Sequence, residues 1–293
     1  MWPLLQIELL KIFRKPRTYI SFGAIAAMVL IIQIALKFDG QSYIEFIVGD
    51  LKESLEIPYD HILNGYFVCF VILNLLLIHI PLLIALVAGD SVAGEANLGT
   101  LRLLVSKPVS RQKLLLAKFG ATTIYTSLLL LWMAVLALGL SLAVFGANDI
   151  LIMRADGLEI VRSSDVLWRY LAAFAYAALA LTTVAALAFL LSVFADNSIG
   201  PIVATISIVI VFTILSEMQI PLYDRTVKPF LFTSHMLAWK GFFYSRVNPD
   251  GTAVAGSIEN LRAIGKSSLV LILYITGFLS AAMYIFNRKD ILS

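Results

Sequence analysis

The chain has 293 residues, of which 60% are hydrophobic and only 14% are charged, and its mean hydropathy is +0.91. Soluble globular domains are nearer half apolar and a quarter charged, so this composition excludes an ordinary soluble protein and indicates a membrane protein. The net charge is +3, and the single cysteine, Cys69, excludes an intrachain disulfide.

The first predicted element is an amphipathic helix over residues 1–17. Apolar side chains recur at helical spacing, and basic side chains gather near the end of the segment, at Lys11, Arg14 and Lys15. Such a pattern is typical of a helix that lies on the inner membrane interface, and Pro16 should end it. The apolar run that follows is too long for the core of a signal peptide, so we expect it to remain as a span.

Six apolar runs are long enough to cross a bilayer. They cover residues 18–37, 66–88, 119–146, 170–194, 199–219 and 267–286. Since a helix satisfies its own backbone in lipid, we expect an all-α polytopic fold in which residues 1–293 form one transmembrane domain. The fourth run is rich in alanine at small-xxx-small spacing, for example Ala173 and Ala177, which predicts a helix packed inside the bundle.

Basic residues are denser in segments 1–17, 89–118, 195–198 and 287–293 than in segments 38–65, 147–169 and 220–266. The positive-inside rule therefore places both termini in the cytoplasm and predicts a multi-pass protein of the plasma (inner) membrane. Segment 220–266 is longer than a simple hairpin. Its stretch "FLFTSHMLAWKGFF" is strongly apolar.

Motifs for catalysis, cofactors or metals are weak. Residues 260–268, "NLRAIGKSS", end like a phosphate loop, but Asn260 stands where that motif needs glycine, so the chain has no nucleotide site of its own. Asn74 and His79 are polar residues deep in the second span, about 140° apart around a helix. A hydrogen bond to another helix explains each of them better than catalysis does, and the histidines lack metal-ligand spacing.

The inner loop 89–118 carries the most distinctive pattern. Apolar residues at Leu98, Leu101 and Val105 predict a short amphipathic helix that Pro108 ends, and Ser110 is a candidate cap for a second helix. Glycine costs ~1 kcal/mol against alanine inside a helix. Gly99 therefore suggests the close approach of another backbone or of a partner surface.

This loop resembles the signature of type-2 ABC transporter permeases, which are six-span subunits that work with a separate ATPase. The resemblance rests on Glu95, Gly99, Thr100, Leu101, Leu104, Ser106, the run Pro108 to Arg111, Leu115 and Lys118. The stretches "RKPRTY", "LLSVFADNSIG" and "FNRKDI" agree with it, and it covers essentially the whole chain. In that family the loop contains a cytoplasmic coupling helix that docks into a groove of the ATPase. The family also often has short helices that dip into the outer leaflet, and the resemblance implies them for the apolar stretch within segment 220–266. By match, the coupling residues would be Glu95, Gly99, Thr100, Arg102, Pro108 and Arg111.

The resemblance implies the permease subunit of an ATP-driven exporter, with two ATPase copies and a second permease that is either identical or a sibling. ATP and Mg would belong to the ATPase, and this chain would hold no cofactor or metal and catalyse nothing itself. Its other partners would be the bilayer and an extracytoplasmic protein, and no nucleic acid. Two alternatives stay open, namely a membrane enzyme for lipids or isoprenoids that uses Asn74, His79 and His235, and a scaffold that recruits proteins.

Overall fold

The computed structural model describes residues 1–48, 62–101, 109–154, 157–218, 220–246, 248 and 254–289. Within them, six helices are long and apolar enough to cross a membrane. These are α2 (Pro16–Val48), α4 (Gly65–Ala88), α7 (Arg111–Ala134) with its continuation to Phe145, α9 (Ser163–Phe194), α10 (Ile199–Glu217) and α13 (Leu261–Arg288). The protein is therefore an all-α polytopic membrane protein, as predicted.

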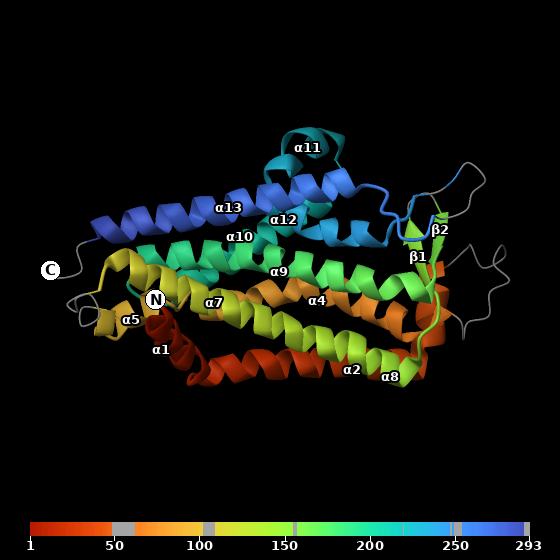
Figure 1. Ribbon diagram of the computed structural model, residues 1–293, viewed down its shortest axis with the longest axis horizontal. Helices are drawn as coiled ribbons and strands as arrows, with labels where there is room; N and C mark the ends of the chain where they lie inside the picture. The colour runs from red at the N-terminus through yellow and green to blue at the C-terminus, as the bar shows by residue number, and fades with distance from the viewer. Residues whose placement is uncertain are drawn as a thin grey trace.

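The long helices run side by side, and helix α1 (Trp2–Phe13) and the end of α13 lie at the same end of the bundle (Figure 1). The short helix α5 (Ala93–Asn97) is also at that end, whereas the hairpin of β1 (Ile150–Arg154) and β2 (Gly157–Val161) is at the opposite end. Helix α9 is the most buried of the six. Ala173 and Ala177 on α9 are fully buried, which confirms the predicted packing of the fourth span inside the bundle.

Helix α2 ends at Val48 instead of residue 37, and α13 starts at Leu261 instead of residue 267. Two more helices begin well before the predicted spans. Helix α7 starts at Arg111 instead of residue 119, and α9 starts at Ser163 instead of residue 170. The added turns contain Lys118 and Arg169, whose side chains are 1% and 0% exposed. Hydropathy ended each predicted span at a charge, but the helix continues because tertiary partners neutralise that charge.

A π-helical turn, η2 (Val135–Leu140), joins α7 to α8 (Ser141–Phe145). A π-turn interrupts the regular pattern of backbone hydrogen bonds, and an unpaired carbonyl is costly in lipid. Gln33 on α2 meets this need, since its Nε2 donates to the carbonyl of Leu136 at 3.0 Å and to Ser141 Oγ at 2.9 Å. This contact fastens α2 to the third span.

The segment after α10 folds back along the bundle as short helices (Figure 1). They are α11 (Pro221–Thr226), η3 (Lys228–Phe230), α12 (Phe232–Met236) and η4 (Leu237–Phe243). Phe232, Trp239 and Phe243 are almost fully buried among the spans. The predicted short helices are thus present, and their entry into the outer leaflet stays a prediction.

Candidate functional site at the junction of α1, α5 and α7

Helix α1 (Trp2–Phe13) turns its charged face toward the protein. Glu8 is buried, whereas Trp2, Ile7 and Leu10 on the opposite face are 64%, 49% and 56% exposed. Pro16 occupies the first position of α2, where its missing N–H costs nothing, so the chain bends between the two helices. An apolar face that points away from the protein fits a helix lying against lipid.

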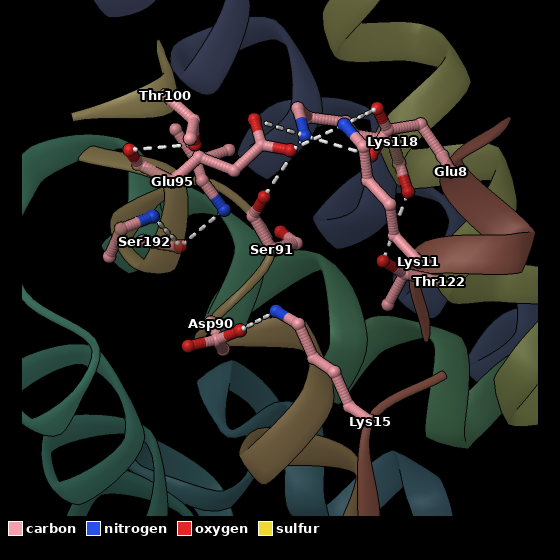
Figure 2. Close-up of polar contacts among 12 residues, drawn as sticks. Glu8, Lys11, Lys15, Asp90, Ser91, Glu95, Thr100, Lys118, Thr122 and Ser192 are labelled. Carbon is pink, nitrogen blue, oxygen red and sulfur yellow. Dashed lines mark hydrogen bonds and ion pairs between the residues drawn. The ribbon is translucent and has the colours of Figure 1, made fainter. Parts of the chain in front are cut away.

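Four charged side chains from three elements form a closed ring (Figure 2). Lys11 Nζ lies 2.7 Å from Glu8 Oε1 and 2.7 Å from Glu95 Oε1. Lys118 Nζ lies 2.8 Å from Glu8 Oε2 and 2.6 Å from Glu95 Oε2, and the second of these contacts is an ion pair without hydrogen-bond alignment. The charges alternate around the ring and cancel, so α1, α5 and α7 are joined at one point.

Three of the four side chains in this ring are almost fully buried. The side chain of Lys118 is 1% exposed, and those of Glu8 and Glu95 are 9% and 11% exposed. Burial alone would raise the pKa of Glu8, but Lys118 and Lys11 outweigh it and hold that pKa below its usual value. Burial would lower the pKa of Lys11, but its bonds to Glu8 and Glu95 raise it instead. Both shifts show that the ring favours the charged forms.

A second cluster lies beside the ring, centred on Asp90 at the end of α4. Its Oδ2 binds Lys15 Nζ at 2.6 Å and also the guanidinium of Arg17, while its Oδ1 accepts from the hydroxyl of Ser198. Burial and the neighbouring Arg17 lower the pKa of Lys15 to about 8. One carboxylate here faces two cations, so the cluster has a positive excess.

Helix α5 is held in place by a side chain from another helix. Ser192 on α9 accepts from the backbone N–H groups of Val92 and Ala93 at 3.1 and 2.9 Å, which caps the start of α5 (Figure 2). A Cβ on Gly94 would lie 2.4 Å from Oδ1 of Asp90. Glycine is therefore required where α5 passes directly over that carboxylate.

The predicted coupling residues separate into different environments. Glu95 is buried in the ring, whereas Gly99 and Thr100 lie in an exposed tip that also contains Asn97 and Leu98. Gly99 has φ +69°, and nothing lies within 4 Å of a Cβ built on it. Within the described chain no other backbone approaches this glycine, and its left-handed backbone conformation explains it. The approach of a partner surface stays a prediction. This turn also interrupts the short amphipathic helix predicted across Leu98 and Leu101.

Arg111 lies at the C-terminal side of the loop and binds the end of α13. Its Nη1 donates to the carbonyls of Phe286, Asn287 and Lys289 at 3.3, 3.3 and 2.8 Å. These are the free carbonyls at the C-terminus of α13, where a cation is favoured. The predicted cap is confirmed, since Ser110 accepts from the N–H of Lys113. Arg102 and Pro108 lie outside the described residues.

The polar residues of the second span bond within their own helix. Asn74 donates to the carbonyl of Phe70 at 3.0 Å, and Nδ1 of His79 lies 2.6 Å from the carbonyl of Leu75. The prediction of hydrogen bonds to other helices is wrong here, because an i−4 carbonyl is within reach of each side chain. In the described part of the chain, no group of three or more His, Cys, Asp or Glu residues could hold a metal ion.

Sequence reasoning missed Glu8, Lys11, Asp90 and Lys118 as members of a shared site. The sequence predicts Lys118 only as a basic residue of the inner loop, and Glu8 only as part of an interfacial helix. One signal was available, because Glu8 is the only acidic residue in the first 38 positions and lies in an otherwise apolar helix. The partners could not be found, because they lie up to 110 positions apart.

The fold and this junction define a class, an all-α multi-pass membrane protein in which a buried ionic ring joins the first short helix to a corner between spans. Residues 18–292 match the family described as "Protein of unknown function (DUF2705)", and the chain belongs to that family. The match includes Asp90, Glu95 and Lys118 and begins after α1. No curated protein matches the chain.

Proposed function

We propose that this chain is the transmembrane permease subunit of an ATP-driven ABC exporter, and that the α5 corner receives force from a separate ATPase. The observation that carries the proposal is the position of Glu95. It lies on a five-residue helix between two spans and is bound to both α1 and α7 through buried charges. A displacement of α5 would therefore move α1 and α7 with it.

The exposed tip supplies the surface for the ATPase. Leu98 is 71% exposed although it is a large apolar side chain, and it stands beside Gly99 and Thr100. Buried apolar contacts at the centre of an interface contribute most of its binding energy. In this proposal Leu98 binds in a groove of the ATPase. Glu95, which is buried, is a positioning residue that holds the tip to the bundle.

The driving free energy comes from the partner, so this chain needs only two arrangements of its helices that the ATPase favours differently. Gly99 gives the tip its left-handed turn, and Ser192 and Arg111 bind the two ends of the loop to α9 and α13. Through these contacts, a displacement of α5 would also be transmitted to α9 and α13. The enzyme alternative has less support among the described contacts, because Asn74 and His79 bind carbonyls of their own helix and His235 contacts Ser267 and the carbonyl of Pro229.

Affinity purification of the full chain from its native membrane tests the proposal. We expect a P-loop ATPase to co-purify, and Leu98→Asp to reduce its recovery at least tenfold by placing a charge in the apolar contact. The matched control is Leu261→Asp, because Leu261 is 55% exposed and is the first residue of α13, far along the helix from its end beside α5. Recovery of no ATPase with the unchanged chain would overturn the proposal.

Glu95→Gln tests the coupling step. Charge reversal at this position would place a third cation against Lys11 and Lys118, so the neutral amide is the cleaner change. We expect the complex with the ATPase to assemble while transport-linked stimulation of ATP hydrolysis is lost. Full stimulation in this variant would remove Glu95 from the mechanism and leave the ATPase assignment to be judged by co-purification alone.

A further inference from the structure

The bend between α1 and α2 carries an excess of positive charge. The ionic ring is neutral, since its two lysines face two glutamates. Beside it, Lys15 and Arg17 share the single carboxylate of Asp90. The guanidinium of Arg14 is exposed and forms no ion pair or hydrogen bond with another described residue. The bend therefore holds three cations against one carboxylate.

The two signs of charge lie at different depths. The side chain of Asp90 is 8% exposed, whereas those of Lys15 and Arg17 are 38% and 28% exposed. Ser198 further occupies the second oxygen of Asp90. The outer surface of the bend consequently presents cations, with their carboxylate beneath them. An anion that approaches the surface of the bend therefore meets the cations before it meets Asp90.

Exposed apolar side chains lie within a few positions of these cations along the chain. Leu10 on α1 and Tyr19 and Ile20 on α2 are 56%, 62% and 62% exposed. The apolar span begins at Pro16, so the cations stand at the edge of the segment that crosses the bilayer. This arrangement places a positive group level with lipid headgroups and an apolar surface level with acyl chains.

We infer that the α1–α2 bend is a binding site for an anionic phospholipid, whose phosphate contacts Arg14, Lys15 and Arg17 and whose acyl chains lie along Tyr19 and Ile20. The occupant is a lipid and not free phosphate, because exposed apolar side chains lie within a few positions of the cations, at the start of the span. Basic pockets at the ends of spans recognise such headgroups. The inference does not depend on the proposed transport function.

The pKa of Lys15 agrees with this arrangement. Burial is the main cause that lowers that pKa to about 8, and the neighbouring charge of Arg17 lowers it further, although Asp90 already faces Lys15. A bound phosphate would supply a second negative charge. It would therefore raise the pKa of Lys15 toward its ordinary value and strengthen its own binding.

Titration with lipids of defined headgroup tests the inference on the purified, delipidated full chain. Native mass spectrometry at pH 7 would measure binding of phosphatidylglycerol and of phosphatidylcholine with the same acyl chains, and inorganic phosphate would be a third arm. We expect phosphatidylglycerol to bind at least tenfold more tightly than phosphatidylcholine. Equal binding of the two lipids, or binding of free phosphate as tight as that of phosphatidylglycerol, would overturn the inference.

Variants assign the binding to the bend. Each basic residue near a membrane surface contributes about 1 kcal/mol to attraction of anionic lipid, so Arg14→Gln with Lys15→Gln should weaken phosphatidylglycerol binding roughly thirtyfold. Arg14→Gln alone removes no contact within the described structure and should weaken binding about fivefold without loss of folding. The control is Lys113→Gln, an exposed lysine on α7 at the same end of the bundle. Unchanged binding in both bend variants would refute the site.

Discussion

Removal of Lys118 is the sharpest test of the ionic ring. Lys118→Met keeps the length of the side chain but leaves Glu8 and Glu95 to share Lys11 alone. Loss of one partner from a buried ion pair costs about 3–5 kcal/mol, because a charge then remains buried without compensation. Here two carboxylates lose a contact, and Lys118 is 1% exposed, so the upper part of that range applies.

The measurement is the apparent melting temperature of the purified protein in detergent, followed by size-exclusion chromatography after heating. A change of 1 kcal/mol shifts the midpoint by about 2–4 °C for chains of this size, so Lys118→Met should lower it by about 10 °C or more. Lys113→Met is the matched control, since Lys113 is exposed and forms no side-chain contact with another described residue. It should change the midpoint by less than about 2 °C.

A double variant separates the electrostatic cause from a loss of packing. Adding Glu95→Gln to Lys118→Met leaves Glu8 and Lys11 as one balanced pair, so the double variant should be more stable than Lys118→Met alone. Residues in contact within one charge network show such non-additive effects. A double variant that loses the sum of the two single effects would refute the ring as the source of stability, as would a Lys118→Met protein no less stable than the control.

Three further predictions use the same thermal assay. Gly94→Ala should destabilise the protein by about 1–3 kcal/mol, because the added Cβ would meet Asp90. The control is Gly265→Ala, which should be neutral or stabilising because nothing lies within 4 Å of its Cβ. Equal effects of the two substitutions would contradict the close approach at Gly94. Gln33→Leu should cost about 1–3 kcal/mol by leaving a carbonyl of the π-turn unpaired, and an unchanged midpoint would contradict that role. The lowered pKa of Lys15, about 8 against 10.5, means that the unfolded chain binds more protons between these values. The stability of the unchanged protein relative to Lys15→Gln should therefore rise from pH 8 to pH 10 and stay level below pH 7, and a relative fall would contradict the shift.

The fold followed largely from the sequence because lipid imposes a simple rule. A run of about twenty apolar residues has to be helical, since no water is present to satisfy its backbone. The same rule explains the errors in helix bounds. It counts a charge as the end of a span, but α7 and α9 continue through Lys118 and Arg169, whose charges are compensated by partners. Pairing of this kind depends on the tertiary structure.

The candidate site was predicted only in part. Glu95 and Gly99 were selected through a resemblance, and the structure gives them distinct physical roles, one as a buried ion-pair partner and one as a left-handed turn. Arg111 was selected through the same resemblance; the structure shows that it binds the end of α13, and its contact with a partner stays a prediction. A side chain's contacts with distant elements cannot be read from its local pattern, because spacing within a helix fixes only which face it shares.

The sequence by itself determined the membrane class, the number of spans, the break at Pro16 and the burial of the alanine-rich fourth span. Each of these depends on hydrophobicity or backbone chemistry that acts over a few residues. Only the tertiary structure decided that Glu8, Lys11, Glu95 and Lys118 form one ring and that the α1–α2 bend presents cations above a buried carboxylate. The physical reason is that charge compensation depends on distance in space, and these groups meet only after the helices have packed.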